Sequence, residues 1–172
     1  DDLARAKSLA DYLHELNKSR ESIERSVYLA ANKQAQAQLD AGSHNALVLA
    51  GTGWHKGVIG IVAGRLAEKY HCPVLVASLD EMGVQPGVGS GRSVPGFNLA
   101  QALEACDPFL LGHGGHAAAA GFQCATENMD QFRIAFCEYV DAQCDGDMQQ
   151  VDLKIDAEVP LSGLTLQAVE QI

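Results

Sequence analysis

The fold is decided by residues 46–77, which read ALVLAGTGWHKGVIGIVAGRLAEKYHCPVLVA. Residues 46–50 and 73–77 are short apolar runs of the kind that forms buried strands. Between them, residues 58–70 carry an apolar stripe at helical spacing. Its members are Ile59, Val62, Leu66 and Tyr70. A strand, a helix and a strand in this order predict a parallel pair joined by a right-handed crossover.

The segments around this unit extend the prediction to an α/β domain. Apolar and small residues recur at helical spacing from Leu3 to about Leu39, which predicts one long helix, or two helices joined near residues 17–19. Downstream, Asn98 is a good N-cap for a short helix that ends at residues 107–108, and residues 128–141 predict a final amphipathic helix. We therefore expect an α/β fold with a mixed, largely parallel sheet, flanked by helices and preceded by the long helix.

Two glycine-rich stretches interrupt this pattern. Residues 83–96 predict a loop. In residues 112–121 we expect an anion-binding turn at Gly114-Gly115 that leads into a one-turn helix of alanines, followed by a strand at residues 122–125. Near the end of the chain, the alternation in residues 151–156 predicts another strand, and residues 161–172 predict the start of a further helix.

Composition restricts the class of protein. The formal net charge of -10 argues against a generic basic nucleic-acid binder, although the acidity is concentrated in residues 129–172, where nine acidic side chains accompany two basic ones. The five cysteines are scattered and contain no Cys-x-x-Cys pair, which indicates reduced, apolar thiols. No apolar run reaches the roughly 20 residues that cross a bilayer, and the first residues do not resemble a signal peptide. We expect a cytoplasmic protein without membrane contact.

The first segment with the residue types of a binding site is Gly51–Gly57. Its glycines match neither a dinucleotide-binding turn, because Lys56 occupies the position of the last glycine, nor a P-loop. A glycine-rich turn before a helix still offers free N–H groups to an anion. Trp54, His55 and Lys56 add a stacking surface, a hydrogen-bond donor and a charge, a mixture that single-stranded nucleic-acid sites use. The alternative is a capped turn with Trp54 packed on the domain edge.

The second segment is the glycine-rich stretch of residues 87–93, in which Arg92 is the only basic residue between Lys69 and Arg133. Ser90 and Ser93 flank it with hydroxyls, and Gly91 allows the backbone to turn its amides toward a ligand. A guanidinium in this setting can bind a phosphate with two parallel hydrogen bonds. We favour this interpretation over a turn with a surface ion pair.

The third segment, residues 112–122, contains Gly114, Gly115 and two histidines, His113 and His116. No carboxylate or cysteine lies within several residues of the histidines, so phosphate contact is favoured over metal ligation. For His113, a core histidine beside a tight turn is the alternative. We expect Arg92 and His116 to converge on one anion site, because loops at the ends of elements in an open α/β sheet gather on one edge.

No catalytic signature is present in the sequence. There is no Asp-His-His run, no pair of metal-binding carboxylates and no Ser/His/Asp signature. The sequence therefore predicts a binding platform with no catalytic residue, no metal ligand and no cofactor of its own.

Together the three segments resemble, in order and spacing, the DHHA1 domain of the RecJ exonuclease family, which belongs to the DHH/DHHA1 phosphoesterases. The matching residues are Gly53–Ala63, Gly89–Ser93, Gly114–His116 and Ala119–Gly121. The resemblance implies three parts: a connector helix in residues 1–41, a DHHA1 domain in residues 42–146, and in residues 147–172 the truncated start of a segment that leads to an OB-fold domain.

The resemblance also implies a function. Members of this family are metal-dependent exonucleases that degrade single-stranded DNA from its 5′ end in DNA repair and recombination, and their manganese or magnesium ions lie in a DHH domain that precedes DHHA1. We thus expect this chain alone to be inactive. Carried over by motif, Ser90, Arg92 and His116 contact phosphates near the 5′ end, with His55 a further candidate. Val88 and His113 depart from the family pattern, Val88 by removing the charge of a lysine.

Two other functions fit parts of the sequence. A DHHA1 domain could serve a phosphodiesterase of short oligonucleotides or cyclic dinucleotides, with the same arginine and Gly-Gly-His residues around a small ligand. Alternatively, the acidic last third could make the chain a protein-interaction module. The complete Gly-Trp-His-Lys-Gly-Val-Ile-Gly motif of residues 53–60 favours the RecJ family.

Overall fold

The computed structural model describes residues 2–42, 45–143, 158, 160, 165 and 166, and the expectations for residues 151–156 and 161–172 lie largely or wholly outside them. Four α-helices are described: α1 (Leu3–Asp40), α2 (Ile59–Tyr70), α3 (Leu99–Ala105) and α4 (Met129–Gln143), with 3-10 turns η1 (Asp107–Phe109) and η2 (Thr126–Asn128). The strands are β1 (Leu47–Thr52), β2 (Val74–Leu79), β3 (Gly87–Arg92), β4 (Gly112–Gly115) and β5 (Ala119–Cys124).

The strands form one sheet in the order β1-β2-β3-β5-β4. The parallel pairing of β1 with β2 around α2 is the one predicted from residues 46–77, and the α/β class is confirmed. The expectation that the sheet would be largely parallel was wrong, because β2–β3, β3–β5 and β5–β4 all pair antiparallel. For β2–β3 and β4–β5 the cause is a short connection between consecutive strands, since a hairpin cannot join parallel strands.

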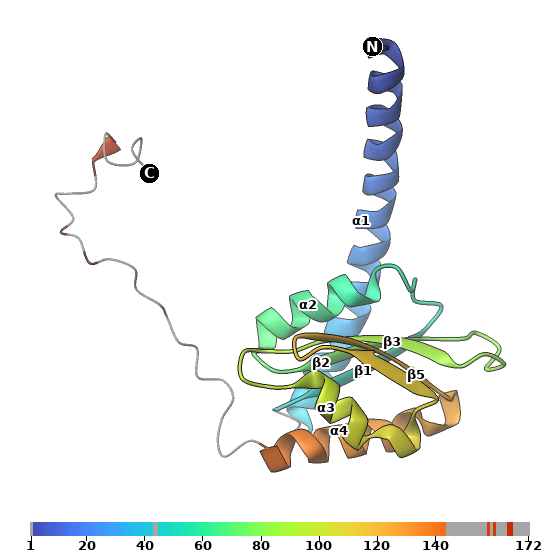
Figure 1. Cartoon of the computed structure of the whole chain (residues 1–172), viewed down its shortest axis with the longest axis vertical. Helices are drawn as coiled ribbons and strands as arrows, with labels where there is room; N and C mark the ends of the chain where they lie inside the picture. Colours follow the sequence, from blue (N-terminus) through green and yellow to red (C-terminus); the bar gives the residue numbers. More distant parts are fainter. Residues whose placement is uncertain (1, 43–44, 144–157, 159, 161–164, 167–172) are drawn as a thin grey trace.

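The sheet lies between two layers of helices (Figure 1). On one face, α1 and α2 cover alternate apolar side chains of β1 and β2. These side chains are Leu47, Leu49, Val74 and Val76. On the opposite face, α3 and α4 pack on Leu75, Phe122 and their neighbours. Because alternate residues of each strand point to opposite faces, this arrangement fixes the direction in which every residue of β3 and β5 points.

Strand β3 was predicted as a loop, and its glycines explain the difference. Gly89 and Gly91 point to the α3–α4 face, where the ring of Phe122 occupies the space that a side chain at Gly89 would need. Leu75 and Leu99 fill the space beside Gly91 in the same way. The glycines thus admit large side chains from neighbouring elements into the core, one of the uses that glycine has inside a strand.

Residues 112–124 form a hairpin, so the expected one-turn helix of alanines does not exist. Ala119 and Ala120 belong to β5, opposite Arg92 and Gly91 of β3. The prediction that Asn98 caps a short helix is confirmed. Its side chain accepts a hydrogen bond from the Gln101 N–H at the start of α3.

Helix α1 is one continuous helix, and its second half packs on the domain. Val27, Ala31 and Ala35 are buried there. The second half of the predicted connector helix thus packs together with the sheet.

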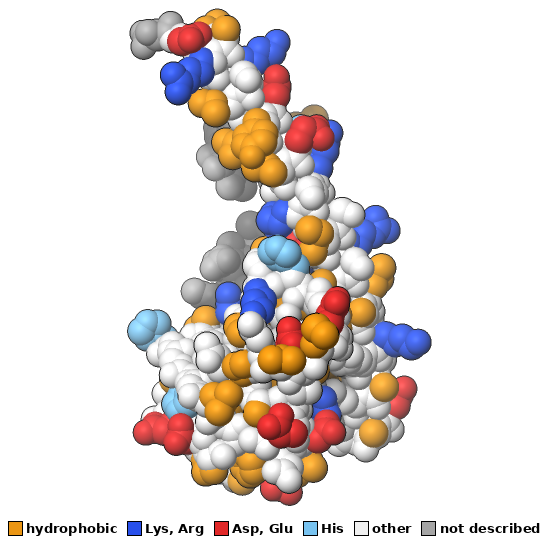
Figure 2. Space-filling view, turned by 90° about the vertical axis from the view of Figure 1, so that its right-hand side faces the viewer, with side chains coloured by type: hydrophobic (Ala, Val, Ile, Leu, Met, Phe, Trp, Pro, Cys, Tyr) orange, Lys and Arg blue, Asp and Glu red, His pale blue; other side chains and the backbone are white. Residues whose placement is uncertain are grey.

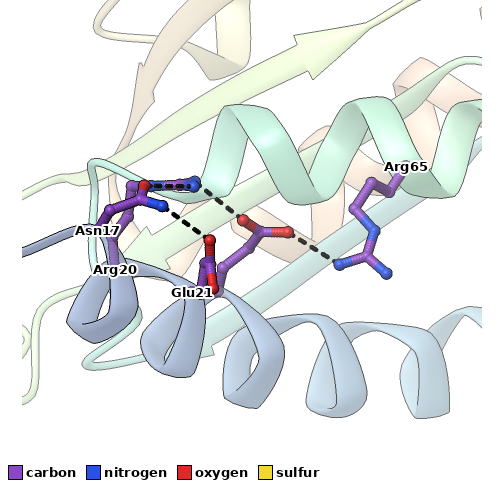
Figure 3. A network of polar contacts seen from close by, with 5 residues as sticks. Asn17, Arg20, Glu21 and Arg65 are labelled. Atoms are coloured by element: carbon purple, nitrogen blue, oxygen red, sulfur yellow. Dashed lines mark hydrogen bonds and ion pairs between the residues drawn. The ribbon is translucent and has the colours of Figure 1, made fainter. Parts of the chain in front are cut away.

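Polar side chains also fasten α1 to its neighbours. Glu24, with only 11% of its side chain exposed, pairs with Arg20 of its own helix at 3.0 Å and with Arg65 of α2 at 2.8 Å (Figure 3). The Arg65 guanidinium lies 4.3 Å from the ring centre of Tyr28. These contacts fix how α1 lies against α2.

Two glutamines of α1 act on the outer edge of β1. Gln34 Nε2 donates to the Ala50 carbonyl and Gln34 Oε1 accepts from the Ala50 N–H, at 2.8 and 3.2 Å. Gln38 makes the same pair of bonds with Val48, at 2.8 and 3.3 Å. Each side-chain amide thus satisfies one residue of an edge strand in the way that a neighbouring strand would.

The first half of α1 projects away from the sheet (Figure 1). Apolar side chains lie exposed along it (Figure 2), and they include Leu9, Leu13 and Leu16, which are 53%, 62% and 49% exposed. None of the helices in the described part of the chain is long and apolar enough to cross a membrane.

Candidate nucleic-acid interface

The candidate site lies on the part of the sheet next to α2 that no described helix covers. Here β3, β5 and β4 present one face beside α2. Cross-strand pairing places Ser90, Gly121 and Gly114 in one row, because Ser90 pairs with Gly121 and Gly121 with Gly114. The residues of β4 are exposed throughout, so this face is open to a ligand.

Arg92 and Ser90 form the side of this face that borders α2. A side chain at Gly60 of α2 would reach within 2.9 Å of Ser90 Oγ and 3.1 Å of Arg92 Nη2. Glycine at this position thus lets the first turn of α2 approach the guanidinium closely. Residues 87–93 are thereby brought next to α2, the helix that directly follows the glycine-rich turn of residues 51–57.

The hydrogen bonds of Arg92 leave most of its donors available. Nη1 donates to the Gly91 carbonyl at 2.8 Å and to Ser90 Oγ at 3.2 Å. Within the described residues, Nε and Nη2 have no hydrogen-bond partner, and the Ser90 hydroxyl keeps its own proton to donate. A guanidinium held on one side with a free edge on the other is arranged for two parallel bonds to one anion.

His116 lies at the end of the neighbouring row. Arg92 pairs with Ala119, and the His116 N–H donates to the Ala119 carbonyl at 2.8 Å, so the three backbones lie side by side. Two strand spacings put the backbones of Arg92 and His116 about 10 Å apart. His116 is exposed. Its neighbour Gly115 has φ +143°, which gives the hairpin a turn that other residues rarely adopt.

The structure places His113 away from these residues. It pairs with Phe122, which is buried on the α3–α4 face, so His113 belongs to that face too. Its Nε2 lies 3.3 Å from a carboxylate oxygen of Asp107. The sequence reasoning grouped it with His116 on spacing alone, and the alternation of a strand separates them.

Gly91 and Ser93 have structural positions. Gly91 points to the α3–α4 face, away from Ser90 and Arg92. The Ser93 hydroxyl donates to the Phe97 carbonyl at 2.9 Å, which stabilises the loop after β3.

In the loop of residues 51–57 the three candidate side chains have different surroundings. Trp54 packs over Gly51 and against the core under α2, as in the alternative weighed from the sequence. His55 Nδ1 accepts a hydrogen bond from the Gly57 N–H at 3.0 Å and so stabilises its own turn. Lys56 is exposed and remains available to a ligand.

One feature beside Arg92 escaped the sequence reasoning. A cavity of about 540 Å³ lies along the second half of α2 and is lined by Arg92, Ser93, His71 and Ala118, among others. His71 has φ 53° and is the one non-glycine residue with positive φ in the described part of the chain. From the sequence, His71 could have been predicted to cap the C-terminus of α2, because it directly follows the helical pattern. Its position near Arg92 could not have been predicted, because no local sequence pattern connects the two residues.

Metal ligands are not grouped anywhere in the region that the structure describes. No three His, Cys, Asp or Glu side chains there lie together in a way that could hold a metal ion.

Comparison with known proteins agrees with these observations. The family model for the DHHA1 domain matches residues 43–142. The single-stranded-DNA-specific exonuclease RecJ of Dickeya dadantii is 34% identical over 99% of this chain, and that of Bacillus subtilis is 33% identical over 92%. The chain spans 30% and 20% of the length of these two relatives.

Solved structures give the same result. A RecJ from Thermus thermophilus in complex with Mg²⁺ superposes with a TM-score of 0.71 and 31% identity, covering 83% of this chain and 21% of that one. An exonuclease RecJ bound to manganese has the same TM-score at 30% identity, covering 87% of this chain and 36% of that one. The chain therefore belongs to the DHHA1 domain family, in which its relatives are RecJ exonucleases.

Proposed function

We propose that this domain binds the 5′-phosphorylated end of single-stranded DNA, within a cytoplasmic RecJ-type exonuclease of DNA repair and recombination. The observation that carries the proposal is the Arg92 guanidinium, held by Gly91 and Ser90 with Nε and Nη2 unused in the described structure. Two parallel N–H groups on a fixed cation are the arrangement that proteins use to bind phosphate.

His116 and the Gly-rich hairpin complete the proposed site. A strand whose terminal phosphate lies on Arg92 and Ser90 would run across Gly121 toward Gly114 and His116. His116 would donate to a second phosphate through a ring N–H. The relatives named RecJ are exonucleases specific for single-stranded DNA, which supports the choice of this ligand.

The chemistry of strand cleavage belongs to residues outside the described structure. In the proposal, manganese or magnesium is held by a DHH domain of the longer protein, and this domain together with an OB-fold domain encloses the strand. The described residues offer no group of metal ligands to substitute for it. We expect the purified 172-residue chain to leave single-stranded DNA intact when manganese is added.

The phosphate site is tested by fluorescence anisotropy with short strands that carry a 5′-phosphate or a 5′-hydroxyl. Arg92→Ala is expected to remove about 1.5–3 kcal/mol of binding to the phosphorylated strand, the range for hydrogen bonds to charged groups. Arg92→Lys keeps the charge but not the paired donors, so most of the loss remains. Arg25→Ala, an exposed arginine of α1, is the charge-matched control.

An Arg92→Ala protein with an undiminished preference for the 5′-phosphate would refute the site. Because few phosphates are engaged, affinity should fall only about tenfold or less between low and moderate salt. Tighter binding of a dinucleotide than of a longer strand would instead support the phosphodiesterase of small ligands.

A further inference from the structure

The cavity beside Arg92 is too large for a phosphate alone. At about 540 Å³ it falls within the roughly 300–1,000 Å³ that small-molecule sites occupy. The cavity adjoins Gly64 and the aliphatic part of Arg92, whereas the guanidinium lies one helical turn away beside Gly60, so a phosphate on the guanidinium would leave the cavity itself empty. The cavity extends from Arg92 along the second half of α2 to His71, it is lined on the other side by the loop after β3 and by the β4–β5 turn, and it is partly open to solvent.

Small and apolar groups form its walls. Gly64 and Ala67 of α2 face Val94, Pro95 and Ala118 across the cavity. A side chain at Gly64 would be in ordinary contact with the aliphatic part of Arg92, 3.8 Å from Cγ, and would narrow the cavity. A flat, weakly polar ring fits between such walls better than a hydrated ion does.

Hydrogen-bonding groups stand at the end of the cavity away from the Arg92 side chain. Glu68 and His71 line it there, and both are exposed. A carboxylate accepts hydrogen bonds, and an imidazole donates or accepts them, which are the properties that side chains use toward the edges of bases. Ser93 contributes little, because its hydroxyl already donates to Phe97.

His71 adds a conformational observation. With φ 53°, it holds the left-handed position after α2 that glycine or asparagine usually takes, while its N–H donates to the Ala67 carbonyl at 2.9 Å. Histidine is less suited to this backbone than glycine, so its presence at the rim of the cavity agrees with a role for the ring.

We propose that this cavity is a nucleoside subsite, which takes the base of the nucleotide whose phosphate Arg92 binds. The apolar walls would contact the faces of the base, and Glu68 and His71 would bond its edge. The proposal rests on the phosphate site proposed above, since Arg92 lines both. It adds that the domain recognises a nucleotide rather than a phosphate.

The test uses three versions of one short strand: 5′-phosphorylated, 5′-phosphorylated with an abasic first residue, and 5′-hydroxylated. Binding to the 172-residue chain is followed by amide chemical shifts, which report weak affinities and locate the contact. We expect removal of the first base to weaken binding about tenfold, because the apolar contacts of its faces and the hydrogen bonds of its edge are both lost. The shifts at Gly64 and Ala118 should shrink with it.

The matched variants are Ala118→Leu and Ala117→Leu. Both alanines are exposed in the β4–β5 turn, and both carbonyls accept a backbone hydrogen bond, from Ser93 and Leu99 respectively. Only Ala118 lines the cavity. Ala118→Leu should therefore bind the complete strand no better than the abasic one, whereas Ala117→Leu should keep the tenfold difference.

A second variant guards against misfolding. His71→Asn keeps a residue that tolerates positive φ but removes the ring, and it should weaken binding of the complete strand severalfold while leaving the abasic strand unchanged. Equal binding of complete and abasic strands by the parent chain would overturn the subsite, as would an unaffected Ala118→Leu variant. Binding that depends on the first base but not on the 5′-phosphate would refute the phosphate site and, with it, the nucleoside subsite that rests on it, whereas binding that depends on the 5′-phosphate alone would refute only the subsite.

Discussion

Gly114 and Gly115 are neighbours in the hairpin, yet the protein needs them for different reasons. Gly115 has φ +143°, and a side chain there would lie 2.5 Å from the Ala119 carbonyl oxygen. Nothing lies within 4 Å of the place where a side chain at Gly114 would stand. Gly115 is therefore required by the fold, whereas Gly114 leaves space above the sheet for a ligand.

This difference gives a prediction. Gly115→Ala should lower the free energy of unfolding by about 1–3 kcal/mol, because the substitution adds backbone strain and a close contact. Gly114→Ala should change stability by less than about 1 kcal/mol, the cost of a residue change without strain. Urea denaturation compares the two. Equal losses would mean that the turn does not have the conformation described.

Gly114→Val extends the comparison to function. The larger side chain would stand in the row of Ser90 and Gly121, over which we propose that the strand passes. The variant should stay folded and bind 5′-phosphorylated DNA more weakly.

Buried thiols predict a loss of stability at alkaline pH. Burial, with a contribution from Cys137, raises the pKa of Cys72 from 9.0 to about 12, and the same causes raise the pKa of Cys106 to about 11. Above pH 9 the unfolded chain loses these protons while the folded chain keeps them, so ionisation favours unfolding. The stabilising contribution is complete below pH 9 and is lost as the pH rises toward 11 to 12.

Thermal unfolding between pH 8 and about 10.5 measures this effect. The melting temperature of the parent protein should fall with rising pH. The melting temperature of the Cys72→Ala variant should fall less steeply over the same pH range, because one titrating group has been removed. A parent protein and variant with the same slope would show that other groups dominate.

At the scale of elements, the unit β1-α2-β2 could be predicted because its pattern and its packing agree: continuous apolar strands are buried on both faces. Strand β3 could not, because glycine carries no pattern that distinguishes the inside from the outside of a sheet. Only the neighbours Phe122, Leu75 and Leu99, far away in sequence, give Gly89 and Gly91 their place. The hairpin β4–β5 escaped for the same reason.

The contacts between α1 and the edge of β1 also predict a difference between similar residues. Gln34→Ala leaves both backbone groups of Ala50 without these partners, so it should cost about 1–3 kcal/mol of unfolding free energy. Gln38→Ala should cost less, because Arg133 Nε still donates to the Val48 carbonyl at 3.0 Å.

Gln36→Ala is the control for both variants. Gln36 is exposed on the same helix, and alanine suits a helix at least as well, so stability should stay within about 0.5 kcal/mol of the parent value. Chemical denaturation ranks the three. The loss of unfolding free energy should be largest for Gln34→Ala, smaller for Gln38→Ala and smallest for Gln36→Ala. Any other order would contradict the inference that the side-chain amides stabilise the edge of β1.

For the whole molecule, α1 divides into two halves of unequal stability. The apolar positions Leu9, Leu13, Leu16 and Ile23 continue the apolar stripe of α1 toward its N-terminus. Val27 and Ala31 of this stripe are buried against the domain, whereas the four earlier residues are exposed. Most of the stability of a helix in a protein comes from packing of its apolar face against other elements, and the first half of α1 lacks that contribution.

Hydrogen exchange should resolve this division. Amides of residues 5–20 are expected to exchange at least about tenfold faster than those of residues 27–38, whose helix is held by the sheet. Uniform slow exchange along α1 would mean that another surface covers the projecting half in solution.

The candidate site was predicted in part. Arg92, Ser90 and His116 were found from residue type, because a lone arginine among glycines and hydroxyls is informative by itself. Their arrangement depends on strand register, which places Ala119 between Arg92 and His116 and turns His113 to the other face. The cavity beside His71 depends on how α2 lies over β3, and no local pattern encodes that.

The two edges of the sheet differ, and this difference sets a limit on how copies of the domain can join. The amides of Gln34 and Gln38 occupy the edge at β1, whereas no described strand or helix pairs with the outer edge of the exposed strand β4. A sheet grows into a fibre only if both edges can accept a partner. With one edge occupied, two copies of the domain can pair through β4, but the resulting pair has no second open edge for a third copy.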